Sequence, residues 1–259
     1  MSDLRIERVG TTAVFTLDNA ATRNALTPAA RDALAQALAE LRNDSDVRAL
    51  LLAGANGAFC AGGDLRNIAS AKLAGAAGRE RMRNTHRWLR ELLLLDIPVI
   101  AAVDGAAYGA GFSLALAADF VLASPRARFC MSFVKLGLVP DLGAFYTLPR
   151  VVGPQRAREL MLSGREIGAA EARELGIAME LHEPEQLVPR ALTLAASFEG
   201  ASPLAVSLIK RATADAGALD GILDAEANAQ ALAFGSPEHQ EAVTRFLDKQ
   251  PPRFAWPRQ

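Results

Sequence analysis

The chain has 259 residues, of which 51% are hydrophobic, and it carries 28 Lys and Arg against 29 Asp and Glu. This length and composition suffice to bury the core of one large α/β domain without disulfides or metal ions. The nearly balanced charge favours neither nucleic acid nor an anionic membrane as a partner, so we expect a small-molecule ligand.

Cysteine content and the N-terminal sequence indicate the compartment. Cys60 and Cys130 are too few for a disulfide framework and fit a reducing environment. Residues 1–10 are polar and alternating, unlike a secretory signal. Apolar runs such as residues 98–103 are much shorter than the ~20 residues that cross a bilayer. We therefore expect a cytoplasmic protein without membrane partners.

The first part of the chain alternates strand-like and helical patterns. Residues 4–9 and 12–17 alternate in polarity around Gly10-Thr11, as in a β-hairpin. Thr27-Pro28 supplies an N-cap and a first-turn proline for a helix that ends at Arg42. The further predicted strands are 47–53, 98–103, 120–124 and 127–131, and the further predicted helices are 79–95, 109–118 and a short one ending near Arg150. This interleaving predicts an α/β fold.

From Gly153 onward the pattern is helical throughout. The predicted helices are 154–162, 169–175, 186–198, 203–216 and 219–234. No low-complexity linker divides the chain into two folds. We expect a core over residues 1–195 and a C-terminal helical region over residues 196–259, whose apolar stripes need a surface to pack on.

Two glycine-rich bends each follow an apolar, strand-like run. They are Phe59-Cys60-Ala61-Gly62-Gly63-Asp64-Leu65 and Gly105-Ala106-Ala107-Tyr108-Gly109-Ala110-Gly111. Small residues expose backbone N–H groups, and the second bend also opens a helix, so converging bends can hold an oxygen that becomes negative during a reaction. For either bend alone, tight turning and close helix–sheet packing explain the glycines equally well. Together the bends favour an oxyanion hole.

Several other reaction classes lack their motifs. The segment from Gly109 resembles a dinucleotide-binding fingerprint, but Leu114 stands where its third glycine belongs and the acidic ribose ligand is missing. No P-loop occurs, and Ser113 lacks the closing glycine of a hydrolase nucleophile elbow. The three histidines show no metal-type spacing, so no metal site is predicted; they are His86, His182 and His239.

The bends and their surroundings resemble the enoyl-CoA hydratase/isomerase (crotonase) superfamily over nearly the whole chain. The matching motifs are Asn24-Ala25-Leu26, both bends, Phe129 followed by Gly137-Leu138-Val139-Pro140, and Ser163-Gly164 with Ala169 and Ala172. Residues 135–141, followed by Leu148-Pro149-Arg150-Val151, look most like the ring-opening and double-bond isomerases, including those acting on phenylacetyl-CoA derivatives.

This resemblance implies a spiral of β-β-α units whose C-terminal helices build a homotrimer, often paired into a hexamer. It implies an acyl-CoA thioester as substrate and no further cofactor. The backbone N–H groups of Gly63 and Ala110 would bind the thioester oxygen as it becomes an enolate.

Other positions of the chain match the family's CoA contacts. Arg23 would reach a CoA phosphate, as would Lys249 from a neighbouring subunit; a solvated loop arginine and a solvated tail lysine are the alternatives. The positions that match backbone grips on the adenine and pantetheine are Ala25, Ala61, Asp64 and Leu65.

Two departures from the family pattern decide between reactions. The paired glutamates of the family's hydratases fall on Ser113 and Phe133 in this chain. Hydration needs groups that orient water and transfer its proton, and Phe133 can do neither. Phe133 should instead make the acyl pocket drier, with Phe145 as a second apolar wall. Ordinary hydratase activity is therefore disfavoured.

Asp141 is the remaining acid. In the isomerases that this chain resembles, an acid just after the Gly-Leu-Val-Pro turn is the single base. The alternative is that Asp141 only caps a helix starting at Leu142. A carboxyl group between Phe133 and Phe145 should have a raised pKa. We expect an acyl-CoA isomerase, and the alternatives are a hydratase or another reaction on this scaffold, or a non-catalytic acyl-CoA binding protein.

Overall fold

The computed structural model describes residues 3–71 and 73–257 of the chain. The strands are β1 (Leu4–Val9), β2 (Thr12–Leu17), β3 (Ala49–Gly54), β4 (Val99–Val103), β5 (Ala106–Tyr108), β6 (Phe120–Ala123), β7 (Arg128–Cys130), β8 (Glu166–Gly168) and β9 (Glu180–Leu181). The α-helices are α1 (Pro28–Leu41), α2 (Leu65–Ser70), α3 (Ala76–Leu93), α4 (Ala110–Leu116), α5 (Ala144–Val152), α6 (Pro154–Ser163), α7 (Ala169–Glu174), α8 (Pro184–Ala196), α9 (Pro203–Thr213), α10 (Ala216–Phe234) and α11 (Pro237–Leu247). Three 3₁₀ helices complete the set: η1 (Ala20–Thr22), η2 (Ser132–Leu136) and η3 (Ser197–Gly200).

A six-stranded sheet in the order β1-β2-β3-β4-β6-β9 forms the centre of the fold. Only the β1–β2 hairpin is antiparallel, and the following neighbours pair in parallel. Parallel strands are buried on both faces, which explains why β3 and β4 are continuous apolar runs. A second sheet, β5-β7-β8, carries the segment around the second glycine-rich bend.

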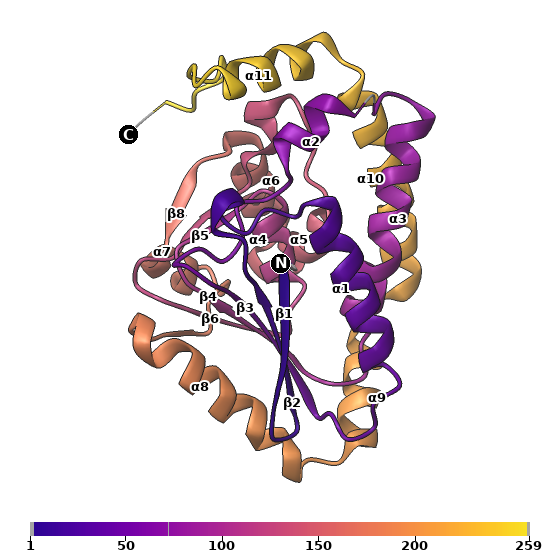
Figure 1. Ribbon diagram of the computed structural model, residues 1–259, viewed down its shortest axis with the longest axis vertical. Helices are drawn as coiled ribbons and strands as arrows, with labels where there is room; N and C mark the ends of the chain where they lie inside the picture. The colour runs from indigo at the N-terminus through magenta and orange to yellow at the C-terminus, as the bar shows by residue number, and fades with distance from the viewer. Residues whose placement is uncertain (1–2, 72, 258–259) are drawn as a thin grey trace.

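The two faces of the central sheet belong to two cores because successive side chains of a strand point in opposite directions. Leu50 and Leu52 of β3 face the larger core, which also contains α1, α3 and α10. Leu51 and Ala53 face a smaller core closed by α8 through Leu187, Ala191 and Ala195. Figure 1 shows α8 on one side of the sheet and α1, α3 and α10 on the other.

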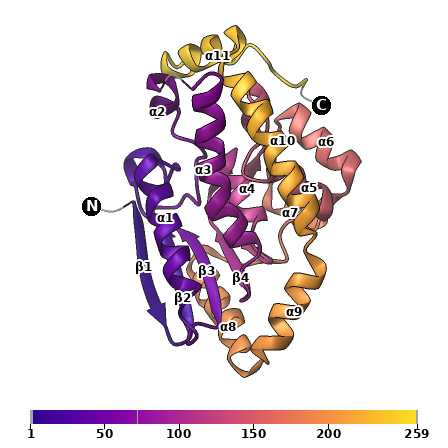
Figure 2. The same ribbon diagram turned by 90° about the vertical axis from the view of Figure 1, so that its right-hand side faces the viewer.

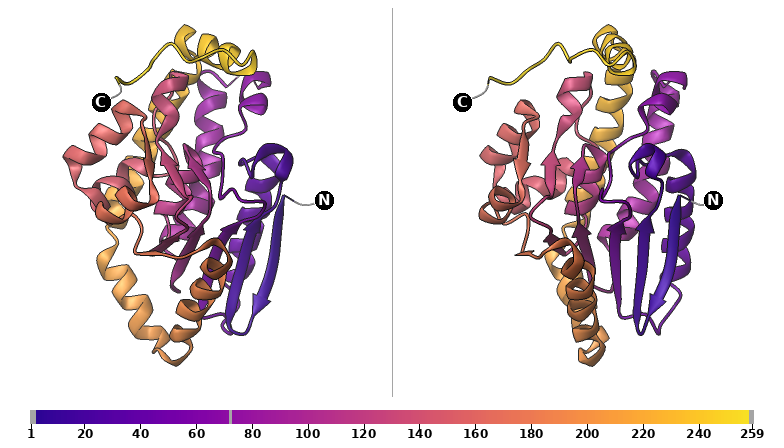
Figure 3. Two further views of the ribbon diagram at one scale, coloured as in Figure 1. Left: turned by 90° about the vertical axis from the view of Figure 1, so that its left-hand side faces the viewer. Right: turned by 60° about the vertical axis from the view of Figure 1, so that its left-hand side comes forward.

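The C-terminal helices leave the sheet and return to it. α9 contributes no buried residue, whereas α10 runs along α3 and joins the larger core (Figure 2). α11 then crosses the end of these helices beside α2, and the C-terminal tail continues from it (Figure 3). The region after residue 195 therefore packs on the core through α10 and α11.

The α/β class and most elements predicted from the sequence are confirmed. The β1–β2 hairpin has the predicted bounds. The prediction of an entirely helical pattern after Gly153 is wrong, because β8 and β9 lie between the helices. Strands of two or three residues offer too few positions for an alternating pattern to be recognised. The pattern also failed to predict α2 and α11, and the second bend contains the short strand β5.

No single helix of the described ranges is long and apolar enough to cross a membrane; one bent pair, Pro184–Gly200 with Pro203–Thr213, passes the test of length and composition together.

Candidate active site

The two glycine-rich bends meet in the structure. Cys60 and Ala107 form a parallel β-bridge, in which the Cys60 N–H donates to the Ala106 carbonyl over 2.9 Å and the Cys60 carbonyl accepts the Tyr108 N–H over 3.0 Å. A Cβ atom at Gly111 would lie 2.1 Å from the Cys60 carbonyl oxygen. The bends thus approach each other more closely than any larger residue would allow.

Gly63 and Ala110 lie where these bends open into a cavity of about 820 Å³, and both line it. Ala110 is the first residue of α4, so its N–H has no partner within that helix. Within the described residues, neither the Gly63 N–H nor the Ala110 N–H donates a hydrogen bond. Two backbone donors on adjoining bends are thus available to a ligand in this cavity.

The loop before α1 is tied to the first bend by a buried asparagine. The Asn24 side-chain amide donates to the carbonyl groups of Ala55 and Ala58, over 2.8 and 2.7 Å. These bonds hold Arg23 and Ala25 at the cavity, which both residues line. Arg23 itself is exposed, and its carbonyl accepts the Ala61 N–H over 3.1 Å.

The remaining predicted CoA contacts also lie at this cavity. Its lining includes Ala61, Asp64 and Leu65. The Asp64 carboxylate caps α2, because it accepts the N–H groups of Arg66 and Asn67 over 3.1 and 3.2 Å. Only the Asp64 backbone and the face of the side chain turned away from the cap are therefore left for a ligand.

Asp141 also lines the cavity, and its two carboxylate oxygens differ. Oδ2 accepts a hydrogen bond from Nε2 of Gln230 on α10 over 3.2 Å. Oδ1 is buried and has no hydrogen-bond partner within the described part of the chain. Burial, and to a smaller extent the nearby charge of Glu226, raise the pKa of Asp141 to about 7, against the lowering effects of Gln230, Arg81 and Arg31. Asp141 can therefore exchange a proton near neutral pH.

A carboxylate of α10 holds the turn between Asp141 and the helix that follows it. The first residue of α5 is Ala144, and Asp141 makes no side-chain bond to its N-terminus. Instead the fully buried carboxylate of Glu226 accepts the Gly143 N–H over 3.1 Å, and it also accepts the Leu142 N–H. The alternative prediction that Asp141 is only a helix cap is wrong, because its carboxylate bonds to Gln230 and to no N–H group of α5.

Glu226 is itself held by a third element. Its Oε1 lies 2.7 Å from Nε2 of His86 on α3. Burial raises the pKa of Glu226, whereas the hydrogen bond with His86 lowers it. His86, for which no role was predicted, thus supports the carboxylate that holds the turn after Asp141.

The predicted apolar walls are only partly confirmed. Phe133 is buried and lines the cavity. Phe145 does not line it: as the second residue of α5 it points outward, with 36% of its surface exposed. Ser113 does not line it either, because it is fully buried within α4 and its hydroxyl donates to the Gly109 carbonyl. The other apolar lining residues near the acid are Ile68, Met82, Leu138 and Leu142.

Lys249 reaches the cavity from its own chain. It follows α11 and adopts a left-handed backbone conformation with φ of 56°. Lys249 therefore lines the cavity of its own chain. That it reaches a CoA phosphate bound to a neighbouring subunit stays a prediction.

Four further polar residues of the site did not emerge from the sequence. They are Arg31 on α1, Arg81 on α3, and Glu226 and Gln230 on α10. The available signal was the spacing of Glu226 and Gln230, four residues apart on the face of α10 that otherwise carries apolar residues such as Leu223 and Ala227. Among the described residues no cluster of His, Cys, Asp and Glu has the arrangement of a metal site.

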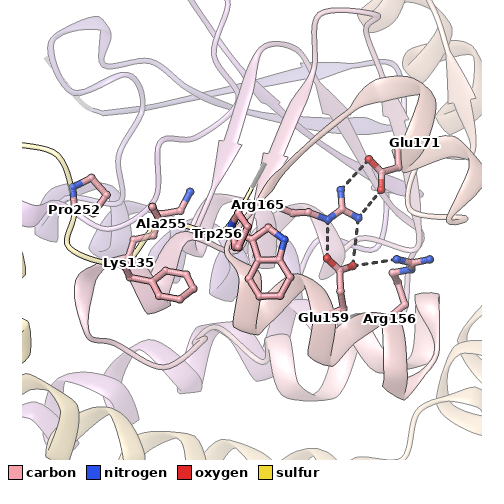
Figure 4. Close-up of a pocket in the computed structure, with 10 residues that line it drawn as sticks. Lys135, Arg156, Glu159, Arg165, Glu171, Pro252, Ala255 and Trp256 are labelled. Carbon is pink, nitrogen blue, oxygen red and sulfur yellow. Dashed lines mark hydrogen bonds and ion pairs between the residues drawn. The ribbon is translucent and has the colours of Figure 1, made fainter. Parts of the chain in front are cut away.

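A second cavity, of about 900 Å³, lies beneath the C-terminal tail (Figure 4). Its charged groups are mostly paired: Arg165 donates to Glu159 and Glu171, each over 2.6 Å, and Glu159 also accepts from Arg156. Lys135 lines both cavities and connects them. With its arginines neutralised, this second cavity offers no group for acid–base chemistry comparable to Asp141.

Comparison with known proteins identifies the relatives of this chain. The family model described as enoyl-CoA hydratase/isomerase matches residues 7–257. The 1,2-epoxyphenylacetyl-CoA isomerase of Escherichia coli (strain K12) is 40% identical over 225 residues, which are 85% of this chain and 86% of that protein. A probable enoyl-CoA hydratase of Rhodobacter capsulatus is 37% identical over 249 residues, 93% of each chain.

Solved structures agree with these matches. The crystal structure of an enoyl-CoA hydratase/isomerase from Cupriavidus metallidurans CH34 is 42% identical, with a TM-score of 0.77, and covers 100% of this chain and 98% of that one. That of an enoyl-CoA hydratase/isomerase from Pseudoalteromonas atlantica T6c is 30% identical, with a TM-score of 0.86 and coverage of 98% and 100%. The crotonase-like fold class predicted from the sequence is thereby confirmed.

Proposed function

The chain belongs to the enoyl-CoA hydratase/isomerase family, and we propose that within it the protein is an isomerase that moves a double bond, or opens a ring epoxide, in an acyl-CoA thioester. The observation that carries this proposal is the carboxyl group of Asp141, which lines a cavity that two free backbone donors also line and whose Oδ1 has no hydrogen-bond partner among the described residues.

The two donors stabilise the charge that develops on the substrate. The N–H groups of Gly63 and Ala110 bind the thioester oxygen, and their bonds strengthen as that oxygen becomes an enolate. Removing one such donor typically costs about 3 kcal/mol in the transition state. Because both are backbone groups fixed by adjoining bends, they need no rearrangement when the charge appears.

Asp141 moves the proton. In a double-bond shift, its carboxylate takes a proton from the α carbon, and the electron pair of that C–H bond enters the enolate. The same carboxyl group then returns the proton to the γ carbon, and the thioester carbonyl is restored. A pKa of about 7 suits both halves of this cycle, because the group must be a base first and an acid second.

The hydratase reading has support from the names of several relatives, such as the probable hydratase of Rhodobacter capsulatus. Against it, Phe133 takes the place of a hydratase carboxylate and lines the cavity. Only one carboxylate in this lining, that of Asp141, is free of a capping role, since Asp64 caps α2. One acid suffices for an isomerisation, whereas hydration uses two in the family pattern.

The resemblance to an epoxyphenylacetyl-CoA isomerase supports a ring-bearing acyl group from phenylacetate catabolism as one substrate. A homotrimer, alone or paired into a hexamer, is part of the proposal. The exposed apolar residues of α9 support it, because Leu204, Leu208 and Ile209 are 67%, 56% and 64% exposed in the single chain.

Asp141→Asn tests the proposed function. The variant should bind a non-reactive acyl-CoA like the wild type and lose at least about a thousandfold in turnover, and the wild-type product should keep the mass of the substrate. Asp46→Asn, on an exposed turn away from the cavity, is the matched control. Unchanged turnover in Asp141→Asn, or a product heavier by one water, would overturn the proposal.

A further inference from the structure

Two arginines stand out in the wall of the cavity that holds Asp141. Arg31 comes from α1 and Arg81 from α3, both are half-buried, and both line the cavity. Nη1 of Arg81 donates to the side-chain oxygen of Asn67 over 3.0 Å. Within residues 3–71 and 73–257, neither guanidinium forms an ion pair, in contrast to Arg165 with its two carboxylates.

The nearby carboxylates do not neutralise this pair. Asp32 acts on Arg31 from the neighbouring position, and Asp141 and Asp64 act on both guanidinium groups, all without forming an ion pair. However, Asp64 is engaged at the N-terminus of α2, and Asp141 is only partly ionised near neutral pH. Two like charges held side by side out of bulk water are costly unless an anion joins them.

Their place in the cavity separates these arginines from the other cations there. Arg31 and Arg81 are the two cationic groups that act on the Asp141 carboxyl. The cations that also line the cavity without being named among the groups acting on Asp141 are the exposed Arg23, Arg66 and Lys249 and the half-buried Lys135. The arginine pair therefore lies near the Asp141 carboxyl group, which the acyl part of a substrate must reach for proton transfer.

Several large apolar side chains line the same cavity. Ile68, Met82 and Leu138 form its wall together with Phe133. A simple alkyl chain would cover these residues and leave both guanidinium groups without partners. A chain with a terminal carboxylate would satisfy both parts of the wall, because guanidinium groups bind carboxylates through paired, charge-assisted hydrogen bonds.

We propose that Arg31 and Arg81 form an anion subsite for the acyl group, and that the preferred substrate is an acyl-CoA whose chain carries a carboxylate. This inference rests on the proposed acyl-CoA isomerase function and names its substrate class. The phosphates of CoA offer oxygen anions of the same kind, so the experiment must separate the two sources.

The test compares adipyl-CoA with hexanoyl-CoA, two non-reactive esters of equal chain length that differ in a terminal carboxylate. Calorimetry should show at least about tenfold tighter binding of adipyl-CoA by the wild type, as expected for a charged hydrogen bond. Arg31→Gln and Arg81→Gln should each remove most of this preference while changing hexanoyl-CoA binding less than about twofold. Retained hexanoyl-CoA binding also shows that each variant is folded.

Arg83→Gln, at an exposed position of α3 outside the cavity lining, is the matched control and should keep the preference. Equal wild-type affinity for the two esters would overturn the inference. Equal weakening of both esters by Arg31→Gln and Arg81→Gln would also overturn it and assign the pair to the CoA phosphates. If neither ester bound the wild type, the proposed function itself would fail, so the two failures are distinguishable.

Discussion

Gln230 binds both the carboxylate of Asp141 and the backbone that precedes it. Its Nε2 donates to Oδ2 of Asp141 over 3.2 Å, and its Oε1 accepts the Val139 N–H over 3.1 Å. One side chain of α10 therefore fixes the position of one carboxylate oxygen, and the other, Oδ1, stays buried without a hydrogen-bond partner among the described residues. The C-terminal part of the chain thus belongs to the site as well as to the core.

The first prediction concerns Glu226, one helical turn before Gln230. Glu226→Gln keeps an oxygen that can accept the N–H groups of the turn but removes the negative charge that raises the pKa of Asp141. The Asp141 carboxyl should then ionise at lower pH. The rise of kcat/KM with pH, expected near 7 in the wild type, should move to lower pH, and activity at pH 6 should increase a few-fold relative to the plateau.

Glu80→Gln, on the exposed face of α3, is the control for Glu226→Gln and should leave the pH profile unchanged. A lower plateau without a shift of the profile would mean that Glu226 acts only through the fold of the turn. An unshifted profile with an unchanged plateau would remove Glu226 from the site altogether.

The second prediction concerns the stability cost of the Asp141 carboxylate. Its folded-state pKa of about 7 exceeds the ordinary value of 3.8, so the folded protein favours the neutral acid. Ionisation therefore destabilises the fold progressively as the pH rises from about 4 to about 7, with a constant cost above that range. Asp141→Asn should match the wild type at pH 4 and be more stable by about 1 to 4 kcal/mol at pH 8.

Urea unfolding of Asp141→Asn and the wild type at several pH values measures this difference directly. The gain in unfolding free energy should grow between pH 4 and pH 7 and then level off. A gain that is the same at pH 4 and pH 8 would show that the carboxyl group titrates normally in the folded chain.

The glycine-rich bends could be predicted from the sequence because their function depends on the backbone. Gly63 and Ala110 need no particular side-chain partner, so small residues after apolar strands indicated the two bends, and the family resemblance assigned the two donors to them. The family resemblance also assigned the acid to Asp141, which follows a local turn motif. Both predictions concern residues whose surroundings are close in the sequence.

The contacts from α10 could not be predicted in this way. Glu226 and Gln230 are 83 and 89 residues from their partners Gly143 and Asp141. Only the packing of α10 along α3 brings them together, and the pattern of one helix does not specify its neighbour. The position of Phe145 was predicted wrongly for a related reason. A shift of one residue along α5 decides whether a side chain faces the cavity or the solvent, and the predicted start of this helix was two residues early.

The third prediction concerns the exposed apolar face of α9. Leu208→Glu places a charge beside Leu204 and Ile209. All three residues are exposed to solvent in the single chain. If this face lies between subunits, the wild type should sediment as a trimer or hexamer and Leu208→Glu should shift it toward the monomer. A monomeric wild type would contradict the proposed assembly. Lys210→Gln, on the same helix, is unsuitable as a control because Lys210 forms an ion pair with Asp119.

The last prediction tests whether the close contact between the bends is necessary. A Cβ atom at Gly111 would lie 2.1 Å from the Cys60 carbonyl oxygen, and backbone on both sides prevents a cheap adjustment. Gly111→Ala should therefore cost about 2 kcal/mol or more of stability and move the Ala110 N–H, with a loss of turnover larger than the loss of folded protein.

Gly221→Ala is the matched control for Gly111→Ala, since nothing lies within 4 Å of its Cβ position on α10. It should stabilise the chain by about 0.5 to 1 kcal/mol, because alanine favours a helix interior over glycine. Urea unfolding and turnover per folded molecule measure both effects. Full turnover in Gly111→Ala would show that the bends tolerate separation and that the two N–H groups need not share one oxygen.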